Sequence, residues 1–128
     1  SVGRHYSRVV AKAASDLRAA EIDLAAAPPL LEDALFHCQQ VAEKSLKAFL
    51  TFHNQPFSKT HNLEELGEAC LRIDAARKEI IDEAVPLTEF AWAFRYPGNP
   101  PPPSLEEVSE ALSIAKKLYA AIRERTVA

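Results

Sequence analysis

The stretch from Phe36 to Leu50 constrains the fold most, because it contains neither Gly nor Pro and is rich in helix-forming residues. At about 100° per residue, four polar side chains share a narrow strip, namely His37, Gln40, Lys44 and Lys47, with Gln39 and Glu43 beyond it. This pattern predicts a core helix with basic and amide groups along one edge. The small and apolar side chains around it fill one continuous arc: Ala34, Leu35, Cys38, Val41, Ala42, Ser45, Leu46, Ala48, Phe49 and Phe52.

Prolines and capping residues divide the rest of the chain into further helices. Pro28-Pro29 ends a first helix, and Asn62 is a good N-cap with Glu65 three residues later. Ser104 and Glu107 form a capping box. The expected helices run from about Tyr6 to Ala27, Leu30 to Asn54, Leu63 to Ile73, Asp74–Ala76 to Arg95, and Ser104 to Arg125. Pro86 falls inside the fourth of these, where it predicts a kink or a break into two pieces.

The predicted fold class is all-α, an up-and-down four-helix bundle with one additional short helix. No period-2 strand and no hairpin-type Asn-Gly or Asp-Gly turn occurs. The short Pro28-Pro29 connection between two long helices implies an antiparallel hairpin. The length of 128 residues predicts a single domain spanning residues 1–128.

Net charge, cysteine positions and the length of apolar runs limit the kinds of function that this sequence can have. The formal net charge of −3 argues against a broad surface for nucleic acid, although local basic pockets remain compatible with it. Cys38 and Cys70 lie at apolar helical positions, which predicts buried free thiols. Without an 18-residue apolar run or a signal-peptide pattern, the sequence predicts a soluble cytoplasmic protein with no membrane partner.

The polar strip of His37, Gln40, Lys44 and Lys47 is the first candidate site. Its cations are suited to phosphate oxygens, and Gln40 to hydrogen bonds with a base or sugar. The alternative is a solvated helix face with a Glu43–Lys47 pair, with His37 partly buried at the edge of the apolar arc. In the preceding helix, the carboxylate of Asp16 either faces a neighbouring helix or, as the simpler expectation, is solvated.

Two further segments carry candidate residues. Lys59 and His61 precede the helix capped by Asn62, where an anion would be favoured, although ordinary capping also explains the pattern. Arg95 and Tyr96 close the fourth helix, where a basic residue suits the helix dipole. Nearby aromatic side chains also provide surfaces on which a nucleobase can stack, namely Phe90, Trp92 and Phe94.

Common catalytic and metal-binding motifs are missing from the sequence. The four histidines, His5, His37, His53 and His61, have no ligand-like spacing, and no HExxH or CxxC occurs. No GxGxxG, Walker or GxSxG motif occurs either. The sequence therefore predicts no metal site, no cofactor and no catalytic residue of a common enzyme class.

Taken together, these segments resemble the HEPN family of small helical domains. The resemblance rests on Asp16-Leu17, on the stretch from Phe36 to Ala48, on Lys59-Thr60-His61-Asn62-Leu63 with Leu66, and on Phe94-Arg95-Tyr96-Pro97. It implies a four-helix bundle related to the C-terminal domain of aminoglycoside nucleotidyltransferases, and frequent homodimers. It also implies pairing with a separately encoded minimal nucleotidyltransferase in toxin–antitoxin-like modules.

The sequence departs from one signature of the family. Many relatives are metal-independent ribonucleases with an Arg followed about four to six residues later by a His, which acts at the scissile phosphate. Arg95 fits the first position, but no His follows His61. The expectation is therefore a nucleotide- or RNA-phosphate-binding module that uses His37, Gln40, Lys44, Lys47, His61, Arg95 and Tyr96. An RNA endonuclease with a non-standard site and a purely structural dimer are the alternatives.

Overall fold

The computed structural model describes residues 2–93 and 101–126, and every regular element within them is helical. The longest helices are α1 (Val2–Ala25), α2 (Leu31–Phe52) and α6 (Leu105–Thr126). The remaining elements are shorter: α3 (Leu63–Ile73), the 3-10 turn η1 (Ala75–Arg77), α4 (Lys78–Ala84) and α5 (Leu87–Ala93). The predicted all-α class is confirmed for this part of the chain.

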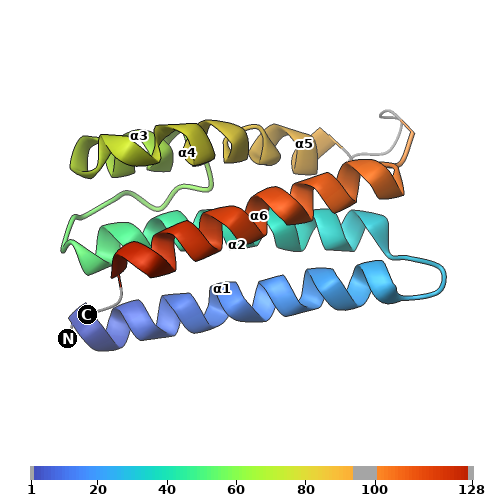
Figure 1. Cartoon of the computed structure of the whole chain (residues 1–128), viewed down its shortest axis with the longest axis horizontal. Helices are drawn as coiled ribbons and strands as arrows, with labels where there is room; N and C mark the ends of the chain where they lie inside the picture. The colour runs from blue at the N-terminus through green and yellow to red at the C-terminus, as the bar shows by residue number, and fades with distance from the viewer. Residues whose placement is uncertain (1, 94–100, 127–128) are drawn as a thin grey trace.

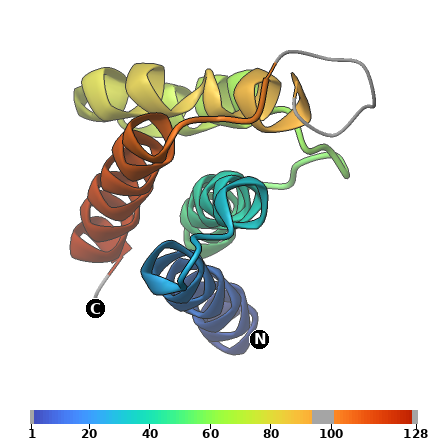
Figure 2. The ribbon, with the colours of Figure 1, turned by 90° about the vertical axis from the view of Figure 1, so that its right-hand side faces the viewer.

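Helix α2 occupies the centre of the molecule. It runs antiparallel to α1, with which it forms a hairpin, and α6 packs against both helices (Figure 1). Helices α3, α4 and α5 form a layer on the opposite side of α2 from α1, as the end-on view shows (Figure 2). A four-helix bundle with an additional short helix is compatible with this arrangement, in which α2 packs against α1, α3, α5 and α6.

The core matches the apolar arc expected from the sequence of α2. Leu35, Val41, Leu46 and Phe49 are almost completely buried, and they belong to one apolar cluster with residues of α3, α4, α5 and α6. Phe52 is only partly buried, at the end of the arc. It contacts the ring of Tyr6 on α1, with 5.5 Å between the ring centroids. Burial of apolar surface on this scale is the main stabilising contribution in a helical domain.

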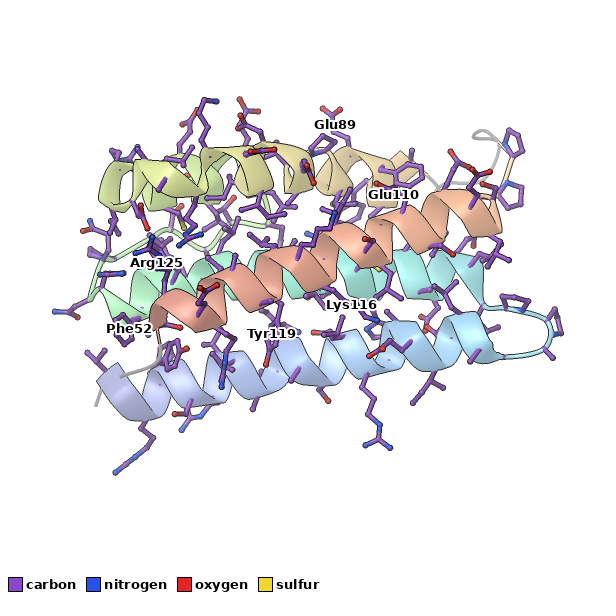
Figure 3. All side chains as sticks on the ribbon, in the orientation of Figure 1. Phe52, Glu89, Glu110, Lys116, Tyr119 and Arg125 are labelled. Carbon is purple, nitrogen blue, oxygen red and sulfur yellow. The ribbon has the colours of Figure 1, made fainter. Side chains whose placement is uncertain are left out.

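Polar contacts line the boundary between α1 and α6. Lys116 points from α6 toward α1 (Figure 3), and its Nζ lies 3.1 Å from Oε2 of Glu21. Tyr119 and Phe52 also lie along this boundary in the same view. The pair of Lys116 and Glu21 is half-exposed, so it contributes little stability by itself.

The predicted helix boundaries are largely confirmed where local chemistry sets them. The amide of Glu107 donates to Oγ of Ser104 at 3.0 Å, and the amide of Ser104 donates to Oε1 of Glu107 at 2.9 Å, which completes the capping box. Oδ1 of Asn62 accepts from the amide of Glu64 at 2.9 Å. The reciprocal bond of a capping box, from the amide of Asn62 to the carboxylate of Glu65, is not formed, because that amide donates to Oγ1 of Thr60 at 3.1 Å. The carboxylate of Glu65 instead accepts from Oγ of Ser58 at 3.1 Å.

The break expected at Pro86 is also confirmed. Helix α4 ends at Ala84 and α5 begins at Leu87, because the proline has no amide hydrogen for the helical ladder. The first and second helices end two residues earlier than expected, at Ala25 and Phe52. The expected end of the fourth helix, including Arg95 and Tyr96, lies outside the described residues.

Cys38 and Cys70 are buried free thiols, as predicted. Burial raises the pKa of each thiol from its ordinary value of 9.0 to about 12, and for Cys38 the charge of Asp23 adds to the effect.

Only the thiolate of a cysteine such as Cys38 or Cys70 reacts with alkylating reagents. We therefore expect iodoacetamide at pH 8 to label the folded protein about a thousandfold more slowly than the unfolded chain. Rapid labelling of either thiol under native conditions, measured by mass spectrometry, would contradict this burial.

Candidate functional site

A buried carboxylate from α1 organises one end of the polar strip on α2. Asp16 accepts a hydrogen bond from Nδ1 of His37 at 2.7 Å and forms an ion pair with Lys44. Its side chain is only 12% exposed, so the simpler expectation of a solvated carboxylate is wrong. On its other side, Nε2 of His37 lies 3.4 Å from Oδ2 of Asp33, one helical turn earlier. The imidazole of His37 and the ammonium of Lys44 are thus both held by carboxylates.

A second buried carboxylate organises the other end of the strip. Oε1 of Glu43 accepts from Nδ1 of His61 at 2.9 Å and from Nε2 of Gln39 at 3.3 Å. Its Oε2 accepts from Nζ of Lys47 at 3.2 Å, which confirms the expected Glu43–Lys47 pair. Gln40 joins this group, because its amide nitrogen donates to Oε1 of Gln39 at 2.7 Å.

The hydrogen bond to Glu43 determines how His61 is presented. A carboxylate accepts from Nδ1–H, so this bond holds the imidazole in one orientation and leaves Nε2 for other contacts. The His61 side chain is 71% exposed, whereas Glu43 behind it is 5% exposed. A buried carboxylate behind an exposed imidazole is a geometry that can bind polar ligands or transfer protons.

A groove lies beside this second cluster, between α2, the segment before α3, and α5. One part has a volume of about 300 Å³ and is lined by Phe36, Gln39, Gln40, His61, Ala91 and Trp92. The adjoining part, of about 510 Å³, shares His61 and Trp92 and is otherwise lined by Thr60, Asn62, Glu64, Val85, Pro86, Thr88 and Glu89. We call these two parts together the Trp92 groove. It combines aromatic walls with amide, imidazole and carboxylate groups.

The backbone amides at the start of α3 are already engaged within the chain. Asn62 accepts from the amides of Glu64 and Glu65, and Oγ1 of Thr88 accepts from the amide of Leu63 at 3.3 Å. The first turn of α3 also carries two carboxylates. A phosphate in the Trp92 groove would therefore depend on side chains such as that of His61.

The structure divides the sequence-predicted residues into two groups. His37 and Lys44 meet at Asp16, whereas Gln40, Lys47 and His61 meet around Glu43 and Gln39. Arg95 and Tyr96 lie outside the described residues and follow the end of α5 closely in the sequence. Gln39 and Glu43 were not among the expected site residues, although their spacing of four places them on one helix face.

Asp23 forms a further polar group near the turn of the α1–α2 hairpin. Burial and the neighbouring carboxylate of Asp33 raise the pKa of Asp23 from 3.8 to about 6, and the charge of His37 partly offsets this increase. Its Oδ2 is buried without a hydrogen-bond partner. The carboxylates of Asp23 and Asp33 and the imidazole of His37 therefore face one another near the turn of the hairpin.

These features define a helical domain whose central helix carries two buried carboxylates paired with basic side chains. A family model described as the HEPN domain matches residues 6–125, so the chain belongs to the HEPN domain family. No curated protein and no solved structure matched the sequence. Among the described residues, no helix is long and apolar enough to cross a membrane.

Proposed function

We propose that the Trp92 groove binds a nucleotide or a single-stranded segment of RNA. The observation that carries this proposal is the joint presence of Trp92 and His61 in both parts of the groove. Aromatic side chains bind nucleobases by stacking, which is how proteins commonly recognise unpaired bases. The Trp92 side chain is 39% exposed, so its ring is accessible from the groove.

The polar groups of the groove are suited to bind different parts of a nucleotide: the base, the sugar and the phosphate. Gln40 has an amide suited to a base edge or a sugar hydroxyl. Glu64 and Glu89 would repel a phosphate, but carboxylates accept hydrogen bonds from the exocyclic amino groups of bases. The phosphate would therefore lie toward His61, with Lys47 supplying further positive charge. Arg95 and Tyr96, which follow α5 in the sequence, complete the proposed set.

Two residues of the sequence-predicted set have a different role in this proposal. His37 and Lys44 are paired with Asp16, and His37 is also close to Asp33. A phosphate would have to compete with those carboxylates for both side chains. We therefore assign His37 and Lys44 to the support of the α1–α2 hairpin, and the binding itself to the Trp92 groove.

Trp92 is the only tryptophan in the chain, so its fluorescence reports directly on the groove. We expect AMP, ATP and a short unstructured RNA to quench this fluorescence, because a stacked base contacts the indole ring. Inorganic tripolyphosphate, which has no base, should leave the fluorescence nearly unchanged. Calorimetry should show that Trp92→Ala weakens RNA binding by about tenfold or more.

Ile22→Ala is the matched control, since Ile22 is also an exposed large apolar side chain but lies on α1 and does not line the groove. It should leave nucleotide affinity unchanged. Equal losses in both variants, or no response to any nucleotide at millimolar concentration, would reject the proposal. Recovering the RNA intact after incubation with the protein separates binding from cleavage, which remains the alternative function.

The partnership implied by the HEPN resemblance is part of the same proposal. The module would form a homodimer and act with a separately encoded minimal nucleotidyltransferase, in a toxin–antitoxin-like pair. Membership of the HEPN domain family supports this pairing. Light scattering of the purified chain and copurification with such an enzyme, encoded by a neighbouring gene, test both parts.

A further inference from the structure

The turn end of the α1–α2 hairpin brings three potential metal ligands together. They are carboxylate oxygens of Asp23 and Asp33 and a ring nitrogen of His37, all within 4.8 Å of one another. Asp33 and His37 are four residues apart and share a face of α2, whereas Asp23 comes from α1. The cluster is therefore built by the packing of two helices.

Asp23 is the most unusual member of this cluster. The residue is 7% exposed, and its Oδ2 is fully buried with no hydrogen-bond partner. Buried carboxylate oxygens nearly always accept a hydrogen bond or bind a cation. Its neighbours in the cluster are the carboxylate of Asp33 and the imidazole of His37. A cation placed among these groups would satisfy the buried oxygen and remove the repulsion between the carboxylates.

The two ring nitrogens of His37 are arranged as in many metal-binding histidines, with one bound to a carboxylate and the other directed toward the cluster. Its Nδ1 donates to Oδ1 of Asp16 at 2.7 Å, which orients the ring and directs Nε2 toward Asp33, 3.4 Å away. Metal-bound histidines usually donate their other N–H to a carboxylate or carbonyl in this way. In a tetrahedral zinc site the ligand atoms lie about 3.5 Å apart, so only modest side-chain movement would be needed.

We propose that Asp23, Asp33 and His37 bind a divalent transition-metal ion of the Zn²⁺ type, with Asp16 as the group that positions His37. The imidazole favours such an ion over Mg²⁺ or Ca²⁺, which prefer oxygen ligands alone. Two carboxylates neutralise its two positive charges. Because the Asp33 side chain is 58% exposed, water can reach the remaining coordination positions. The ion would link the adjoining ends of α1 and α2.

Calorimetric titration of the chelator-treated protein with Zn²⁺ tests this site. We expect one equivalent to bind and the melting temperature to rise with Zn²⁺ concentration. Asp33→Ala removes an exposed ligand without disturbing the core and should abolish both effects. Asp23→Asn should abolish them as well while the protein remains folded by circular dichroism. Asp16→Asn should weaken binding by about 10- to 100-fold, as expected for a positioning residue.

His61→Ala is the matched control, because it removes an exposed histidine that is paired with a different carboxylate. Its affinity for Zn²⁺ should equal that of the unmodified chain. Loss of binding in His61→Ala would place the ion at Glu43 and overturn the proposal. Unchanged binding in Asp33→Ala, or the absence of any binding at micromolar Zn²⁺, would overturn it too.

Discussion

Replacing Asp16 by alanine is expected to lower the free energy of unfolding by about 3 kcal/mol. The substitution leaves His37 and Lys44, whose side chains are 23% and 25% exposed, without their shared carboxylate. Breaking a buried ion pair is costly, because the remaining charge loses its partner and does not fully regain its hydration. The partial exposure of both partner side chains sets the expected loss at the low end of that range. Urea denaturation followed by circular dichroism measures it.

The exposed pair of Lys78 and Asp82 provides a matched control. Their charged atoms are 2.6 Å apart, but both side chains are more than half exposed. Asp82→Ala should therefore change stability by less than about 1 kcal/mol. Adding Lys44→Met to Asp16→Ala should restore part of the lost stability, because one uncompensated charge is removed. A loss in Asp16→Ala no larger than in Asp82→Ala would show that Asp16 is solvated.

Replacing Glu43 by alanine is expected to lower stability by about 2–3 kcal/mol and also to weaken nucleotide binding. The carboxylate accepts from Gln39, His61 and Lys47, and it is almost completely buried. Its removal leaves the buried amide of Gln39 without an acceptor and releases His61 from its orientation. Urea denaturation measures the first effect, and quenching of Trp92 fluorescence by RNA measures the second.

Glu43→Gln separates these two effects. The amide keeps the shape of the side chain and one acceptor, so stability should fall less than in Glu43→Ala. The charge that balances Lys47 and fixes His61 is lost in both variants. If Glu43→Ala retained full stability and full RNA affinity, the Glu43 network would have neither of the roles assigned to it.

Features set by local sequence were predictable. The proline pair at Pro28-Pro29, the break at Pro86 and the capping box of Ser104 each depend on residues within one or two turns. Their chemistry is readable without any knowledge of the fold. The apolar arc of α2 was likewise predictable, because helical periodicity alone separates its two faces.

The electrostatic clusters were not predictable in the same way. Asp16 and His37 are 21 residues apart, and their contact depends on the rotation of α1 against α2. Periodicity shows which face a side chain occupies, but it does not show which partner it meets. For this reason Asp16 was expected to be solvated, and the spacing of the histidines alone did not reveal the group of Asp23, Asp33 and His37.

The ion pairs between α1 and α2 also determine how the two helices are aligned along their length. The buried apolar side chains of α1 are small, namely Val10, Ala13 and Ala20, and such surfaces pack similarly after one helix slides past the other. A shift of one helical turn, about 5.4 Å, would move Asp16 away from His37 or from Lys44, because these two partners are about two turns apart on α2. In either direction the buried carboxylate would lose one of the two side chains that hold it. The carboxylate thus selects a single register for the hairpin, much as one polar residue does in the interface of a coiled coil.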